Sequence, residues 1–222
     1  MSLSILNKLF SGSARVKVLR LFLSNPETAF DVETILTRSK ISRPTLRKEI
    51  KILTDIGFLQ MRTRLLPEIK SVKKAPSKKK AKGKSKKPTA PSRKSISTWT
   101  TNPRFALFQE LKSLLVDSEL VPGKELATRF ATAGSIKMLV LSGIFMRDNE
   151  KSVDMIIVGD KLDMKKMNSV LTTLESEVGK ELRYSIFSPD EFAYRLKMYD
   201  QHLLEIFDAP HERVVDKLGL VG

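Results

Sequence analysis

The sequence predicts an α+β protein of two domains, a helix-rich N-terminal part and a C-terminal part in which strands and helices alternate. Three observations predict this fold class. Apolar residues recur at helical spacing up to about residue 55. Two short β-prone segments, residues 58–64 and 95–101, then flank a lysine-rich run. From residue 136 onward, continuous apolar runs typical of buried strands alternate with helical patterns.

Three helices are predicted in the N-terminal part. Residues 13–24 carry apolar side chains on one face and end at an Asn-Pro pair. The second helix spans residues 31–39 and starts at Asp31, whose carboxylate is a good N-cap. The third spans residues 42–55, with Ser42 as its cap and a proline in its first turn, where the missing N–H costs nothing.

The segments 58–64 and 95–101 are predicted to pair as the two strands of a hairpin. The insert between them, about residues 66–94, is rich in Lys, Pro, Ser and Ala and has almost no large apolar residue. Such a composition cannot bury enough surface to order itself, so we expect a disordered hairpin tip and not an interdomain linker. The predicted domains are therefore residues 1–102 and 103–222.

The chain has a net charge of +15, and all of the excess positive charge lies in its first 94 residues. Residues 1–64 carry 12 basic and 5 acidic side chains, and residues 70–94 carry 12 basic and none acidic. Residues 95–222 carry 16 basic and 19 acidic side chains. This asymmetry indicates a polyanion-binding half joined to a half with another role.

Several classes of protein and site are excluded. The chain has no cysteine, so it has neither a disulfide framework nor a thiolate zinc site. Lysines and arginines interrupt the apolar N-terminal region every few residues, which argues against a signal peptide or a membrane span. We therefore expect a cytoplasmic protein with no membrane partner.

Two helices, a short turn, a third helix and a basic hairpin follow one another in the order of a winged helix-turn-helix. The segment from Ser13 to Arg64 resembles the winged-helix domains of bacterial and archaeal transcription regulators. That resemblance implies that the third helix enters the major groove of duplex DNA. The residues predicted to contact DNA, on that helix, the strand after it and the insert, are Ser42, Arg43, Thr45, Arg47, Lys48, Lys51, Arg62, Arg64, Lys78, Lys79, Lys80, Lys82, Lys84, Lys86 and Lys87.

These cations have two expected roles. Arg43 and Arg47 are four residues apart on the helix, and either can pair with guanine. The insert has no aromatic residue to stack on bases, so we expect it to contact phosphates without reading sequence. The alternative for the third helix is that its charges form only a solvated face.

In the C-terminal domain, the run LSGIFMRDNEKSVDMIIVGD is similar to the core of the nucleotidyltransferase superfamily, which carries Gly-Ser after one strand and Asp-x-Asp at the start of the next. Gly143 matches the glycine, but Ile144 stands where the serine belongs. Asp154 matches the second aspartate, and Ser152 occupies the place of the first. One carboxylate cannot hold two metal ions. Asp154 is thus a vestigial catalytic candidate, and we expect neither a metal nor another cofactor.

The sequence therefore predicts a transcription regulator that binds double-stranded DNA and has no catalytic activity. Its C-terminal domain is expected to form a homodimer, bind a ligand or recruit a protein partner. The alternatives are an active nucleotidyltransferase with a nucleic-acid-binding module and an architectural protein that coats DNA without preference. His202 and His211 have no serine or cysteine at catalytic spacing, so we expect them to be packing or surface residues.

Overall fold

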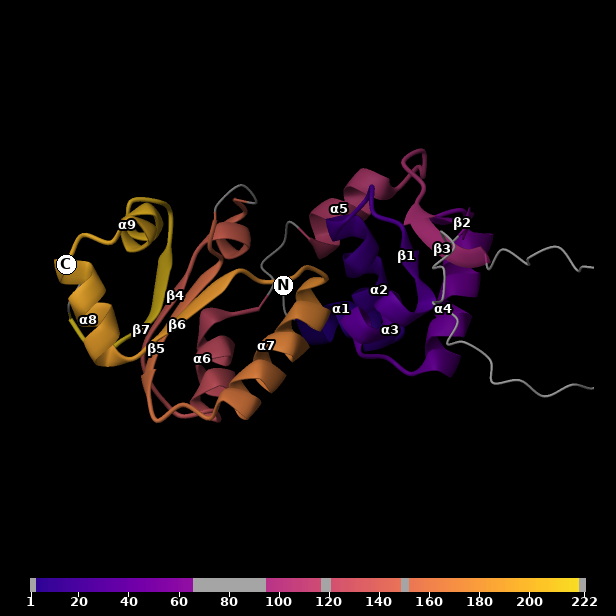
Figure 1. Ribbon diagram of the computed structural model, residues 1–222. Coiled ribbons are helices and arrows are strands. Elements are labelled where there is room, and N and C mark those ends of the chain that lie inside the picture. The colour runs from indigo at the N-terminus through magenta and orange to yellow at the C-terminus, as the bar shows by residue number, and fades with distance from the viewer. Residues whose placement is uncertain (1–2, 66–94, 117–120, 149–151, 220–222) are drawn as a thin grey trace, which may run out of the picture.

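The computed structural model describes residues 3–65, 95–116, 121–148 and 152–219 and shows an α+β protein with two sheets (Figure 1). The first part of the chain contains α1 (Leu3–Leu9), α2 (Ser13–Ser24), β1 (Phe30–Asp31), α3 (Val32–Ser39), α4 (Arg43–Asp55), β2 (Leu59–Leu65), β3 (Ser95–Thr101) and α5 (Phe108–Leu115). The second contains α6 (Gly123–Ala131), β4 (Ser135–Leu141), the 3-10 helix η1 (Gly143–Met146), β5 (Met155–Asp160), α7 (Met164–Val178), β6 (Tyr184–Phe187), α8 (Pro189–Lys197), α9 (Gln201–Phe207) and β7 (Glu212–Asp216).

The predicted caps of α3 and α4 are confirmed. The Asp31 carboxylate accepts a hydrogen bond from the backbone N–H of Thr34 at 2.8 Å. Hydrogen bonds from the side chain and then the backbone of Thr34 lower the pKa of Asp31. The Ser42 hydroxyl accepts from the backbone N–H of Thr45 at 3.4 Å. Both bonds satisfy N–H groups that have no partner inside the helix.

The predicted hairpin is also present. Strands β2 and β3 pair antiparallel, from Leu59 opposite Thr101 to Leu65 opposite Ser95. The short strand β1, which was not predicted, pairs with the other edge of β3, so the order of this sheet is β1-β3-β2. The insert at residues 66–94, with its seven predicted DNA-binding lysines, lies outside the described residues.

Helix α5 belongs by its packing to the N-terminal core. Phe105, Phe108 and Leu111 pack against the buried cluster that α2 and α4 form, and the Phe105 ring meets the Phe58 ring edge-on at 5.4 Å between centroids. The predicted domain boundary after residue 102 therefore lies ahead of a helix that completes the first core. The helix starts only at Phe108, because a turn precedes it.

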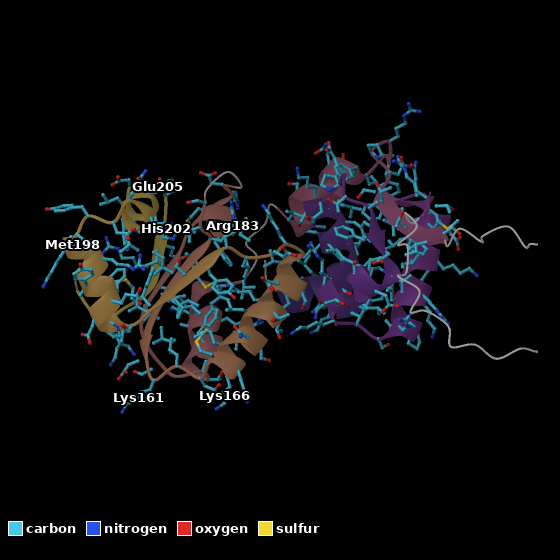
Figure 2. The ribbon with its side chains drawn as sticks, in the orientation of Figure 1. Lys161, Lys166, Arg183, Met198, His202 and Glu205 are labelled. Carbon is cyan, nitrogen blue, oxygen red and sulfur yellow. The ribbon has the colours of Figure 1, made fainter. Side chains whose placement is uncertain are left out.

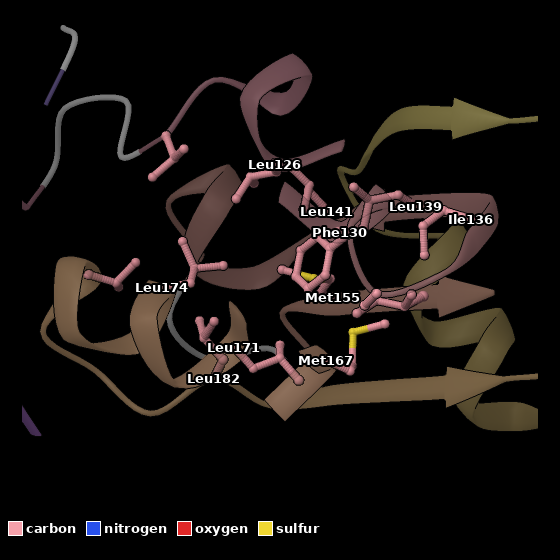
Figure 3. Close-up of a cluster of buried hydrophobic side chains, with 14 of the residues drawn as sticks. Leu126, Phe130, Ile136, Leu139, Leu141, Met155, Met167, Leu171, Leu174 and Leu182 are labelled. Carbon is pink, nitrogen blue, oxygen red and sulfur yellow. The ribbon is translucent and has the colours of Figure 1, made fainter. Parts of the chain in front are cut away.

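The second sheet forms the middle layer of the C-terminal unit, with strand order β6-β5-β4-β7. Strands β4 and β5 are antiparallel, and β5 and β6 are parallel. Helices α6 and α7 cover one face, where side chains such as Phe130, Met155 and Leu174 form the core shown in Figure 3. Helices α8 and α9 cover the other face with Phe192 and Leu203. Alternate residues along β4 and β5 thus enter two different cores.

The two units meet where the C-terminal end of α7 packs on α2. Arg20 is fully buried there, and its Nη1 donates to the carbonyl oxygen of Glu177 at 2.8 Å. The Asn25 amide donates to the carbonyl of Gly179 at 2.9 Å. Burial lowers the pKa of Arg20 to about 10, although nearby Glu177 raises it. These donors satisfy carbonyls that α7 leaves open at its end.

Gly179 is the position where this contact tolerates no side chain. Its φ is +82°, and a Cβ there would lie 2.5 Å from the carbonyl carbon of Arg20. We expect Gly179→Ala to lower the free energy of unfolding by about 2–3 kcal/mol, from backbone strain and from the clash together. Gly57→Ala is the matched control, since Gly57 has a φ of +80° and a Cβ added there would have nothing within 4 Å. If urea unfolding shows the same loss of unfolding free energy for both variants, the clash at Gly179 contributes nothing.

Candidate nucleic-acid interface

Helix α4 has one buried face and one basic face. Leu46, Ile50 and Leu53 are buried in the N-terminal core, so they fix the rotation of the helix about its axis. Three cations, Arg47, Lys48 and Lys51, are exposed on the other side and meet no carboxylate within 4 Å in the described part of the chain. They are therefore available to an external anion.

Two ion pairs shape the surroundings of this face. Glu49, the acid in the middle of α4, is bound by Arg15 of α2, with 2.8 Å between Nε and Oε2. Its charge is thus directed toward α2 and away from the exposed cations. Arg43, at the start of α4, forms an ion pair with Glu33 of α3. This pair restricts the Arg43 side chain, and Arg43 must leave Glu33 or share it in order to contact a base.

The other predicted positions lie at the helix cap and on the hairpin. Ser42 is exposed, and its hydroxyl lies 2.7 Å from that of half-buried Thr45. Arg62 is exposed on β2, where its carbonyl accepts a hydrogen bond from Thr98 at 3.1 Å. Arg64 lies in the same strand opposite Ile96, and its side chain is outside the described part. Figure 1 shows α4 and the hairpin on the side of the N-terminal unit away from the second sheet. Among the described residues, the predicted DNA-binding residues therefore lie together at one end of the molecule.

Asp154, the candidate catalytic residue, is buried and hydrogen-bonded to other residues of the protein. Its side chain is fully buried and accepts hydrogen bonds from the backbone N–H groups of Ile144 at 3.0 Å and Arg183 at 2.9 Å. The Arg183 guanidinium adds bonds from Nε and Nη2, both at 3.2 Å. A Cβ on Gly143 would lie 2.3 Å from Asp154 Oδ1, so the glycine makes room for this carboxylate. Both oxygens are committed to protein donors and face no open site.

Sequence reasoning missed one contact in this region. Ser185 of β6 and His202 of α9 lie side by side, with 3.0 Å between Oγ and Nε2. Their spacing in sequence carries no signal, because the packing of α9 on the sheet brings them together. Nearby, Ser152 donates to Glu205 at 3.4 Å, and Figure 2 shows Arg183, His202 and Glu205 along one edge of the C-terminal unit. No carboxylate among the described residues binds the other ring nitrogen of His202, so a Ser-His-acid arrangement is incomplete there.

Two further features are absent from the described residues. No group of three or more histidine or acidic side chains is placed to hold a metal ion. No helix in this part of the chain has the length and apolarity needed to cross a bilayer. Comparison with protein-family models, with curated proteins and with solved structures finds no match for this chain.

Proposed function

We propose that the protein binds double-stranded DNA through α4 and the β2–β3 hairpin and acts as a transcription regulator. The observation that carries this proposal is the exposed basic face of α4. Arg47, Lys48 and Lys51 lie together on a helix whose opposite face is locked into a core, and no acid neutralises them within the described residues. A rigid helix with unpaired cations suits insertion into a groove lined by phosphates.

The N-terminal unit is proposed to be a winged helix-turn-helix. The order α2, β1, α3, α4, β2, β3 supports this, as does the three-stranded sheet in which β3 lies between β1 and β2. In such an arrangement α4 is the helix that enters the major groove, and the hairpin is the wing. Arg47 is then the residue that contacts base edges, while Lys48, Lys51 and Arg62 contact phosphates.

The C-terminal unit is proposed to be a nucleotidyltransferase-like domain that does not catalyse transfer. Gly143, two residues after the end of β4, and Asp154, directly before β5, support the likeness, since those are the places of the family's motif. The hydrogen bonds around Asp154 support the loss of catalysis, because they leave its oxygens no room for a metal ion. We further propose that this unit serves dimerisation or the binding of a partner in a cytoplasmic regulator.

The test is selection of bound sequences from a random duplex pool, followed by fluorescence anisotropy on the selected duplex. Arg47→Ala is expected to reduce discrimination between the best base pair and the others by about 1–3 kcal/mol at one position, or roughly 5- to 150-fold in affinity. Lys165→Ala is the matched control, an exposed cation on α7 in the C-terminal unit.

Three outcomes separate the possibilities. Selection of a defined sequence whose recognition Arg47→Ala erodes and Lys165→Ala leaves intact supports the proposal. Equal affinity for unrelated duplexes indicates an architectural protein and overturns the regulator. No binding to any duplex at low salt overturns DNA binding itself.

A further inference from the structure

A groove bordered by charged and hydroxyl-bearing side chains runs along the contact between the two units. One cavity, of about 270 Å³, lies between the end of α6 and the face of α7 that carries Ser169, Thr173 and Glu177. An adjoining cavity of about 240 Å³ is lined by residues of α1 and α2, among them Lys17. Arg129 and Glu177 border both cavities. The groove therefore joins elements of both halves of the chain.

Two lysines of the N-terminal unit reach α7 beside this groove without meeting an acid. Lys17 Nζ donates to Ser176 Oγ at 3.1 Å, and Lys40 Nζ lies 3.5 Å from Thr173 Oγ1. Neither ammonium group has a carboxylate within 4 Å among the described residues. A hydroxyl satisfies one donor of an ammonium group but does not offset its charge.

The surrounding charges leave a positive surplus. Arg129 is paired with Glu125 and Glu177, both at 2.6 Å. Buried Arg20 lies behind Glu177, and its Nε and Nη2 have no hydrogen-bond partner among the described residues. The positive side chains here are thus Lys17, Lys40, Arg129 and Arg20, and the carboxylates near them are those of Glu125 and Glu177. The pKa of Lys17 is lowered chiefly by burial, and Lys40 and Arg129 lower it further, although Glu177 raises it.

Neutral donors complete the lining. The amide of Asn7 and the hydroxyl of Ser13 border the second cavity, and neither side chain makes a hydrogen bond to another described residue. Ser13 also begins α2, which has no side-chain cap and no acid in its first turn. An anion near these groups would accept hydrogen bonds that the protein leaves unmade.

We propose that this groove binds the phosphate group of a phosphorylated small molecule. A phosphate carries up to two negative charges and several acceptor oxygens, which match the surplus of cations and the free donors. The two cavities together leave room for a ligand larger than the phosphate itself. Since Lys17 and Lys40 belong to one unit and Arg129 to the other, a ligand held by all three would tie the units together. This site goes beyond the proposed DNA binding and uses none of its residues.

The experiment is isothermal titration of the full chain with inorganic phosphate and, separately, with a nucleoside triphosphate. We expect saturable binding of at least one of them, and Lys17→Met should weaken it about tenfold or more, because it removes a charged donor and keeps the side-chain length. Lys197→Met, an exposed lysine on α8, should leave the affinity unchanged. Thermal melting of each variant checks its fold.

The outcomes show which ligand group is bound and which residues bind it. Binding of both ligands that depends on Lys17 indicates a site for phosphate itself, and binding of the triphosphate alone indicates a nucleotide site. Binding that is lost in Arg47→Ala but kept in Lys17→Met places the anion on α4 and overturns this inference. Absence of saturable binding to either probe also overturns the proposed phosphate site. Duplex binding is measured on the same preparation, so that a failure of the phosphate site can be distinguished from a failure of the proposed DNA binding.

Discussion

Asp154→Ala is expected to lower the free energy of unfolding by about 2–4 kcal/mol, because it leaves the buried N–H of Ile144 and the half-buried N–H and guanidinium of Arg183 without their acceptor. The carboxylate is fully buried and accepts four hydrogen bonds from Ile144 and Arg183. It therefore fastens the start of β5 to η1 and to the residue before β6. Urea unfolding followed by circular dichroism measures the loss.

The controls separate a structural role from a general effect of removing charge. Asp160→Ala removes an exposed acid at the other end of β5 and should change stability by less than about 0.5 kcal/mol. Asp154→Asn keeps the shape and can accept one of the backbone bonds, so we expect an intermediate loss. An Asp154→Ala variant as stable as the parent protein would contradict the role assigned to this residue.

Replacing residues 66–94 by Asn-Gly is expected to flatten the salt dependence of duplex binding. The segment carries 12 basic residues and one acid. If every basic side chain contacts a phosphate, the slope of log affinity against log salt falls in magnitude by up to about 11 when they are removed. Leu65 and Ser95 are opposite each other at the end of the β2–β3 ladder, and Asn-Gly is the preferred two-residue turn for such a register. The hairpin should thus survive the deletion.

A second variant keeps the length of the insert and replaces its lysines and arginine by glutamine. If the charge of the insert causes the steep salt dependence, this variant should have the same flattened slope as the deletion. If the length of the insert causes it, the variant should keep the slope of the parent protein. Sequence preference in the random-pool selection should be retained in both variants, since the insert is expected to contact only phosphates. An unchanged slope in the deletion variant would contradict a DNA-binding role for the segment.

The best-predicted elements are those whose ends are fixed by local chemistry. Helix α2 has the bounds expected from sequence, 13–24, and α3 and α4 begin at their predicted caps, Asp31 and Ser42. Ser188 caps α8 in the same way, with the N–H of Glu191 donating to its hydroxyl at 3.2 Å. Caps and helical spacing involve residues a few positions apart, so a sequence displays them directly.

The elements that were missed depend on distant partners. Strand β1 has two residues and exists because β3 pairs with it, and β7 is added to β4 from the far end of the chain. The apolar run from residue 136 to 145 forms a strand only as far as Leu141, because Gly143 takes a φ of +50° and turns the chain beside Asp154. The contact of Ser185 with His202 and the burial of Arg20 likewise arise from packing between elements, which no local pattern displays.

The contact between Arg20 and Glu177 also sets an order of events during synthesis. The two residues are 157 positions apart. At a translation rate of about 5–20 residues per second, α2 is complete roughly 8–30 s before the carbonyl of Glu177 exists. During that interval the guanidinium of Arg20 and the amide of Asn25 have only water or the nascent chain as partners. The seam between the units therefore cannot form until long after the N-terminal core has been synthesised.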